Sequence, residues 1–119
     1  MNTQIPPEIM KAQKNTMLAE QGIIGAILLD NSLMNEVELT ADQFWLTDCG
    51  MIFDAMQTLH AQRKPIDIVT VSDWLSNTRN VDYFAEIGTY AHNTPSAANG
   101  KTYAEKVKEY WRSREACRI

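Results

Sequence analysis

The sequence predicts an all-α fold in which a compact helical bundle is followed by a C-terminal helical hairpin. Apolar residues recur at intervals of three and four along most of the 119-residue chain, as on the buried face of amphipathic helices. One segment, residues 65–71, is β-branched enough to suggest a strand, but no second strand-like segment could pair with it. A proline-containing corner at residues 93–99 separates the last two helical segments.

The first part of the chain predicts a flexible tail followed by a buried helix. Residues 1–16 are polar and contain two adjacent prolines, which favours a loose tail. The domain proper is predicted over residues 17–119, with its first helix running from about Leu18 to Asp30. Gly22 and Gly25 lie inside this helix, and each lowers helix propensity by about 1 kcal/mol relative to Ala. We therefore expect a second helix to pack closely against them.

The middle of the chain predicts two short helical segments and two longer helices. The short ones lie around residues 33–37 and 40–45, and the aromatic pair Phe44 and Trp45 is expected in the core. A helix that begins at Thr47 or Asp48 ends before Lys64-Pro65.

We interpret residues 65–71 as the start of the next helix rather than as a strand. Ile68, Val71 and Trp74 share one helical face, and Asp67 can accept hydrogen bonds at the N-terminus of the helix. A loop is predicted at residues 76–80. Trp74 and Phe84 are expected in the core.

The C-terminal part, residues 81–118, predicts the helical hairpin. Pro95 fixes its own φ and disfavours the α region for Thr94, so the helix over residues 81–91 ends there. Ser96 can cap the first turn of the final helix, which is predicted over residues 102–119. The corner comprises Asn93, Thr94, Pro95, Ser96, Ala97, Ala98 and Asn99.

Composition excludes several classes of protein. With 11 basic and 15 acidic residues, the net charge of −4 is unlike the basic surplus of most duplex-DNA binders. No apolar segment approaches the roughly 18 residues needed to span a membrane. The N-terminus lacks a secretory signal, and Cys49 and Cys117 lie far apart, which favours a reducing cytoplasm.

No set of residues predicts catalysis or a bound cofactor. Gly100-Lys101-Thr102 resembles the end of a phosphate-binding loop, but Pro95 stands where the first glycine of that motif is required. His60 and His92 have no second ligand at metal-binding spacing. We therefore expect no enzyme activity, no cofactor and no metal.

The final helix carries a candidate protein-binding face. Its apolar residues follow the spacing of a hydrophobic seam on a helix that is otherwise mostly charged. Either this face binds a second protein, or it packs against the chain's own bundle; the sequence leaves both readings open. The face comprises Tyr103, Val107, Tyr110 and Trp111.

Five motifs resemble the N-terminal domain of DnaB-type replicative helicases, and they occur in the order found in that family. Two departures, Cys49-Gly50 in place of a common His-Arg pair and Asp82-Tyr83 in place of Gly-Gly, suggest a divergent member of phage or mobile-element origin. The motifs are Ala19-Glu20-Gln21 with the following apolar residues to Asp30, then Asp42 to Trp45, Ile52 to Met56, Pro65 to Val71, and Asn93 to Asn99.

The resemblance implies a non-catalytic collar domain that pairs into dimers through its hairpin, and three such dimers form a collar above a hexameric motor. It also implies docking of primase or a helicase loader during DNA replication, with only indirect contact with DNA. One alternative is a free-standing protein of the same fold that modulates a host helicase. A less favoured alternative is a small helical protein that binds nucleic acid through Lys101, Lys106, Lys108, Arg112 and Arg114.

Overall fold

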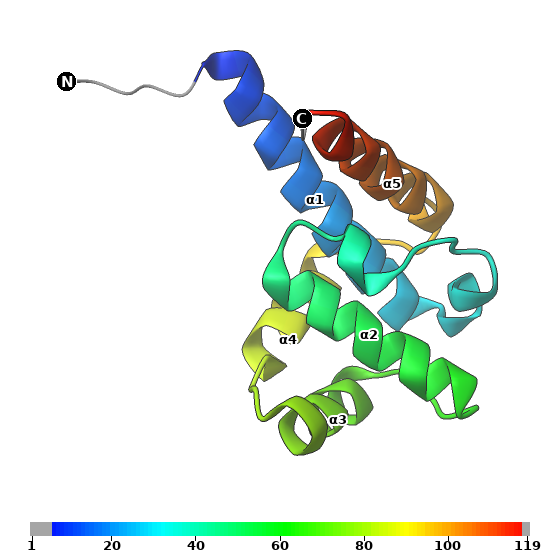
Figure 1. The fold of residues 1–119 in the computed structure, drawn as a ribbon. Coiled ribbons are helices and arrows are strands. Elements are labelled where there is room, and N and C mark those ends of the chain that lie inside the picture. Colours follow the sequence, from blue (N-terminus) through cyan, green and yellow to red (C-terminus); the bar gives the residue numbers. More distant parts are fainter. Residues whose placement is uncertain (1–5, 118–119) are drawn as a thin grey trace.

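The described residues, 6–117, form a helical protein without any strand (Figure 1). This computed structural model confirms the predicted all-α class, and the few remaining residues at either end lie outside the described part. In chain order the elements are α1 (Pro7–Leu29), η1 (Asn31–Asn35), η2 (Ala41–Gln43), α2 (Thr47–Ala61), α3 (Ile68–Arg79), α4 (Phe84–Asn93) and α5 (Gly100–Ala116).

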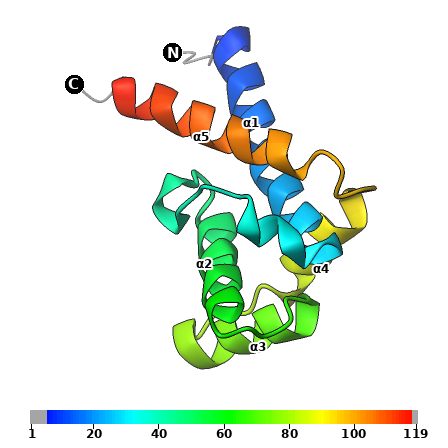
Figure 2. The same cartoon turned by 90° about the vertical axis from the view of Figure 1, so that its right-hand side faces the viewer.

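Helix α1 is the axis of the structure, because α4 and α5 both pack against it and α2 crosses it (Figures 1 and 2). Its C-terminal half is buried on nearly every side, which explains the near-continuous apolar sequence there. Residues of α2 and α3 complete the core below it, with Phe53, Met56 and Leu75 among the fully buried side chains.

The predicted tail is wrong for residues 7–16, which form the first turns of α1. Pro7 occupies the first position of the helix, where the missing N–H would be unsatisfied in any case and the fixed φ suits the helix. The proline pair therefore starts the helix instead of interrupting it. Residues 1–5 of the predicted tail lie outside the described part of the chain.

Residues 65–71 lead into helix α3, as predicted, and Asp67 caps it. The Thr70 N–H donates to Asp67 Oδ1 at 2.8 Å, and the Asp67 N–H donates to Thr70 Oγ1 at 2.9 Å. These reciprocal bonds form a capping box. The preceding turn is held by Asn31, whose side chain donates to the Ile66 carbonyl and accepts from the Ile66 N–H.

The predicted loop at residues 76–80 is wrong, because α3 continues to Arg79. It ends at Asn80, which adopts the left-handed conformation with a φ of 55°. The next residue, Val81, donates its N–H to the Leu75 carbonyl, so residues 81–83 complete the end of α3. Helix α4 consequently begins at Phe84 rather than at residue 81.

Gly25 allows the corner, residues 93–99, to lie directly against α1. A Cβ atom at this position would stand 2.6 Å from the Thr94 Cβ and 2.6 Å from the Tyr90 carbonyl oxygen, closer than atoms can approach. Thr94 is buried there and donates its hydroxyl to the same Tyr90 carbonyl at 2.8 Å. Gly22, one turn away, lies beneath the ring of Tyr103 in α5. The predicted close packing against both glycines is confirmed.

The described part of the predicted hairpin, residues 81–117, packs differently from the prediction, because α4 and α5 each contact α1 more extensively than they contact one another. The corner carries the chain across α1, and α5 then crosses the upper part of that helix (Figure 2). Ser96 accepts the Ala98 N–H at 3.0 Å and so stabilises the corner itself. It does not cap α5, whose first helical residue is Gly100.

The aromatic residues divide between core and surface in a way that the sequence did not predict. Phe44 is buried, with its ring centroid 5.0 Å from that of Phe53. Trp45 is 42% exposed because its side chain points outward where the backbone turns into α2, and Phe84 is 56% exposed at the first position of α4. Trp74 is half-buried.

Replacing Gly25 by alanine tests the close approach of the corner. We expect Gly25→Ala to lower the free energy of unfolding by about 3 kcal/mol or more, since backbone and a buried side chain must move to admit the methyl group. Denaturant unfolding followed by circular dichroism measures this change. The control is Gly88→Ala, where nothing lies within 4 Å of the added atom and a gain of about 0.5–1 kcal/mol is expected. Equal effects of the two substitutions would contradict the packing.

Candidate protein-interaction surface

The four residues of the predicted binding face do not share one exposed surface. Val107 is fully buried against α1, so at this position the seam packs on the chain's own bundle. Tyr103 and Tyr110 are half-buried at the edge of the same contact. Trp111, also half-buried, stands one turn after Val107 and does not join the core cluster. A role for Tyr103, Tyr110 and Trp111 in partner binding stays a prediction.

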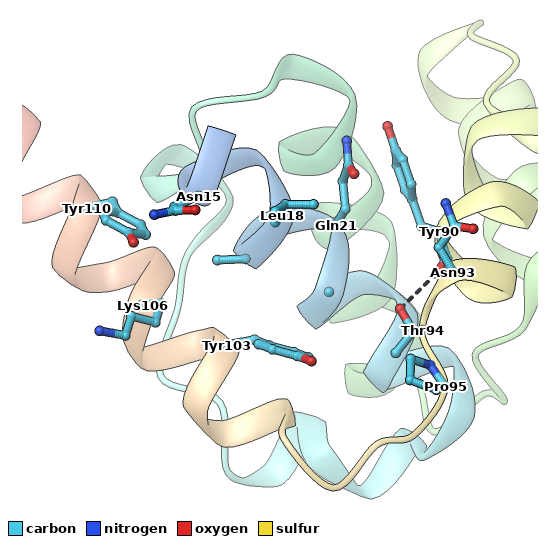
Figure 3. A pocket seen from close by; sticks show the side chains of 12 residues that line it. Asn15, Leu18, Gln21, Tyr90, Asn93, Thr94, Pro95, Tyr103, Lys106 and Tyr110 are labelled. Atoms are coloured by element: carbon cyan, nitrogen blue, oxygen red, sulfur yellow. Dashed lines mark hydrogen bonds between the residues drawn. The ribbon is translucent and has the colours of Figure 1, made fainter. Parts of the chain in front are cut away.

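A groove of about 370 Å³ lies between α1, the corner and α5. Figure 3 shows α1 and α5 as its two walls, with Tyr90 and Pro95 at one end and Tyr110 at the other. Gly22 is part of the α1 wall and has no side chain, so α1 does not fill the groove at that point. The lining residues are Asn15, Leu18, Ala19, Gln21, Gly22, Tyr90, Asn93, Thr94, Pro95, Tyr103, Lys106 and Tyr110.

A second hollow lies between the first turns of α1 and the last turns of α5, in a region that we call the fork. Its volume is about 310 Å³, and it is lined by Glu8, Ile9, Ala12, Gln13, Thr16, Trp45, Tyr110, Ser113 and Arg114. The two helix ends project from the rest of the structure and diverge (Figures 1 and 2), consistent with overall extents of 49 × 30 × 29 Å.

The fork exposes apolar side chains that continue the buried stripe of α1. Ile9 lies on the same helical face as Thr16 and Ile23, at spacings of seven residues, but it is 47% exposed because the bundle does not extend that far. Trp45 lies on the other side of the same hollow. Exposed apolar residues grouped in a hollow are typical of a surface that another protein covers.

Glu20 is a buried side chain of α1, one turn beyond Thr16, at the point where the fork meets the rest of the structure; we call this point the base of the fork. It joins α1 to the segment that leads into α2. It accepts the Trp45 N–H at 2.7 Å and the Leu46 N–H at 2.8 Å, immediately before α2 begins at Thr47. Burial raises the pKa of Glu20 above its ordinary value, while the two backbone N–H groups and the charge of Arg114 oppose that rise.

Arg114 fastens the end of α5 to the same region by donating to the Gln43 carbonyl at 3.0 Å. The sequence indicated only a possible nucleic-acid contact for Arg114 and no separate role for Glu20. The signal for Glu20 was present, since a charged residue occupies the face of α1 that otherwise carries Thr16, Ile23 and Ile27.

Two of the five cations proposed for nucleic-acid binding are held by backbone carbonyls of the protein, and a third has a long, exposed ion pair. Arg114 bonds the Gln43 carbonyl, and Lys108 donates to the Glu38 carbonyl at 2.9 Å. Lys106 lies 3.5 Å from a Glu109 carboxylate oxygen. These partners, together with the acidic residues nearby, do not provide the continuous basic surface that nucleic acid requires.

Residues 6–117 also carry neither of two other kinds of site. No group of three or more His, Cys, Asp or Glu side chains in that part of the chain is placed to hold a metal ion. Among the same residues, no helix combines the length and hydropathy needed to cross a membrane.

Comparison with known proteins gives one consistent relationship. The family model for the DnaB-like helicase N-terminal domain matches residues 12–109. The replicative DNA helicase DnaC of Bacillus subtilis (strain 168) is 35% identical over 118 residues, covering 92% of this chain and 24% of that protein. The replicative DNA helicase DnaB of Buchnera aphidicola is 33% identical over 100 residues, covering 80% of this chain and 22% of the relative. The chain thus spans about a quarter of their length.

A solved structure agrees with the sequence comparison. The crystal structure of the N-terminal domain of DnaB helicase from Mycobacterium tuberculosis superposes with a TM-score of 0.76 at 28% identity. The match covers 82% of this chain and 74% of that structure.

Substituting Glu20 by glutamine tests the buried carboxylate. We expect Glu20→Gln to lower the free energy of unfolding by about 1–3 kcal/mol at pH 4.5, where the contribution of Glu20 is fully present, because glutamine offers one acceptor for two buried N–H groups. At pH 7 the loss should be smaller. The control is Glu36→Gln, an exposed carboxylate, with an expected change within about 0.5 kcal/mol. Equal stability of Glu20→Gln and the wild type would contradict the assigned role.

The pH dependence of stability gives a second readout of Glu20. Its pKa in the folded state is raised, so the folded state holds a proton that the unfolded state releases above its ordinary pKa of 4.5. The contribution of Glu20 to stability is therefore fully present below pH 4.5 and falls as the pH rises through the folded-state pKa. Urea unfolding across this range should show that slope in the wild type and not in Glu20→Gln.

Proposed function

The chain belongs to the DnaB-like helicase N-terminal domain family, and from this premise we propose that it is a self-associating collar and docking domain of a replicative DNA helicase. The family match over residues 12–109 is the observation that carries the proposal. The relatives that support it are named as replicative DNA helicases, and the matched family is their N-terminal domain.

Self-association is proposed to occur through the fork. The projecting turns of α1 lack the packing that stabilises the rest of that helix, and short isolated helices are marginal in water. A second copy of the chain that covers Ile9 and Trp45 would remove their apolar surface from water, and Trp111 on the neighbouring helix is a further candidate contact. The expected assembly is a homodimer, and a trimer of dimers in a complete helicase.

Docking of primase or a helicase loader is the second part of the proposal. The exposed surfaces of α5 and the corner are free to bind such a protein, whereas the cations of α5 are largely engaged with the chain itself. Contact with DNA would accordingly be indirect, and the domain would act in replication through other proteins. A cytoplasmic location is part of this proposal.

Charged substitutions in the fork test self-association. We expect Ile9→Asp combined with Trp45→Asp to convert the dimer into a monomer, because both exposed side chains would bring a charge into an apolar interface. Multi-angle light scattering measures the molar mass. Val69→Asp is the matched control, since Val69 is an exposed apolar residue on α3, at the far end of the structure, and its substitution should leave the dimer intact. A dimer that survives the double substitution would contradict the fork interface.

A chimaera tests the helicase assignment. The chain would replace the matching N-terminal segment of the Bacillus subtilis replicative helicase, to which it is 35% identical. We expect the chimaera to form hexamers and to respond to primase with faster unwinding, both assayed on the purified protein. A chimaera that stays monomeric would contradict the collar role. If the separate chain instead bound the intact helicase, the alternative of a free-standing modulator would be favoured.

A further inference from the structure

The groove between α1, the corner and α5 has the dimensions of a short extended peptide. Tyr103 and Tyr110 stand seven residues apart on α5, which corresponds to about 10 Å along the helix axis. An extended chain rises about 3.3 Å per residue, so three or four residues span that length.

The polar groups of the groove suit a peptide backbone whose N–H and C=O groups are not hydrogen-bonded to one another. Asn15, Gln21 and Asn93 line it, and their side-chain amides make no hydrogen bond to any residue of the described chain. Each amide offers both donors and an acceptor, which match the C=O and N–H groups of an extended segment. A helix satisfies those groups internally and would leave the amides unpaired.

An apolar surface lies between these amides. Leu18 is 55% exposed on α1, and Pro95 and the ring of Tyr103 lie on the other side of the groove (Figure 3). Gly22 keeps the space between them open, because a Cβ atom there would stand 3.0 Å from the Tyr103 ring. One apolar side chain of a bound segment could lie on this surface.

The two ends of the groove differ in charge. Lys106 is the cation among the lining residues, and its ion pair with Glu109 is long, at 3.5 Å, and exposed, so it holds the ammonium group weakly. At the other end, the Tyr90 hydroxyl donates to the Asp48 carboxylate and places a negative charge behind the ring. An occupant with a carboxylate near Lys106 matches this polarity.

We propose that this groove binds an extended peptide segment of a partner protein, with an apolar side chain over Leu18 and Tyr103 and a carboxylate paired with Lys106. The groove is complete within one chain, so the proposal does not depend on self-association. It rests on the proposed docking role, which it narrows to one site and one class of ligand, and failure of peptide binding would leave the proposed self-association untouched.

Nuclear magnetic resonance can test the proposal on the intact chain with defined probes. The ¹⁵N-labelled protein would be titrated with acetyl-Val-Xaa-Thr-Asp-amide peptides in which Xaa is Leu, Met, Phe or Trp. We expect at least one peptide to bind with a Kd of about 1 mM or tighter. The shifted signals should be the Gly22 backbone amide and the side-chain amides of Asn15, Gln21 and Asn93, which line the groove.

Charge variants decide whether Lys106 receives the carboxylate. Lys106→Glu should weaken binding about tenfold or more, and an Asn analogue of the peptide should bind less tightly to the wild type. Lys101→Glu is the matched control, because Lys101 is an exposed lysine of α5 outside the groove, and it should not change the affinity. The same titration on the fork variant should be unchanged. The proposal is overturned if no peptide binds at about 5 mM, if the shifts lie outside the groove, or if Lys106→Glu binds as the wild type does.

Discussion

The structure depends on one close approach, the contact of the corner with Gly25 of α1. The absence of a side chain at this position lets Thr94 and the Tyr90 carbonyl lie against the helix backbone. Gly22 then admits the ring of Tyr103, and Gly100 admits Leu33, because a Cβ atom at Gly100 would stand 2.5 Å from a Leu33 methyl carbon. Because these three positions lack side chains, α5 can approach α1 closely enough to bury Val107 completely. A larger residue at Gly25 would displace the segment that positions both walls of the groove.

The consequence for function is that one helix supplies both the core and the interaction surface. The C-terminal half of α1 is buried, whereas its first turns project with apolar side chains uncovered. Glu20 lies where the two halves meet and binds the backbone just before α2, while Arg114 holds the end of α5 to η2. These polar contacts fix the base of the fork without covering its apolar residues. The proposed collar role uses that combination of a rigid base and an uncovered end.

The sequence predicted those features that depend on local chemistry. The helical class, the Asp67 cap and the close packing at Gly22 and Gly25 follow from periodicity, capping and propensity within short segments. The helix start at Pro7 was missed because the same residue can interrupt a helix or begin one. Other features depend on tertiary packing, which the sequence pattern does not specify. Val107 lies in the apolar seam of α5 and Trp111 lies beside it, yet of these two only Val107 belongs to the core cluster.

The groove and the Glu20 contacts likewise depend on tertiary packing that the sequence pattern does not specify. The groove combines side chains from residues 15–22, 90–95 and 103–110, and its polar lining forms only when these three segments meet. Glu20 could have been identified as structural from its place on an apolar face, but its partners, the N–H groups of Trp45 and Leu46, could not have been identified from the sequence.

The most direct test of how the corner and α5 meet α1 is a measurement of nuclear Overhauser effects between α1 and these two segments. We predict strong effects from the Gly25 α-protons to Thr94 and from the Gly22 α-protons to the ring of Tyr103. Their presence would show that the corner lies on Gly25 in solution and that α5 is held against α1. If both sets were absent while the helices remained intact, α5 would not be held there, and the proposed interaction surface would not exist.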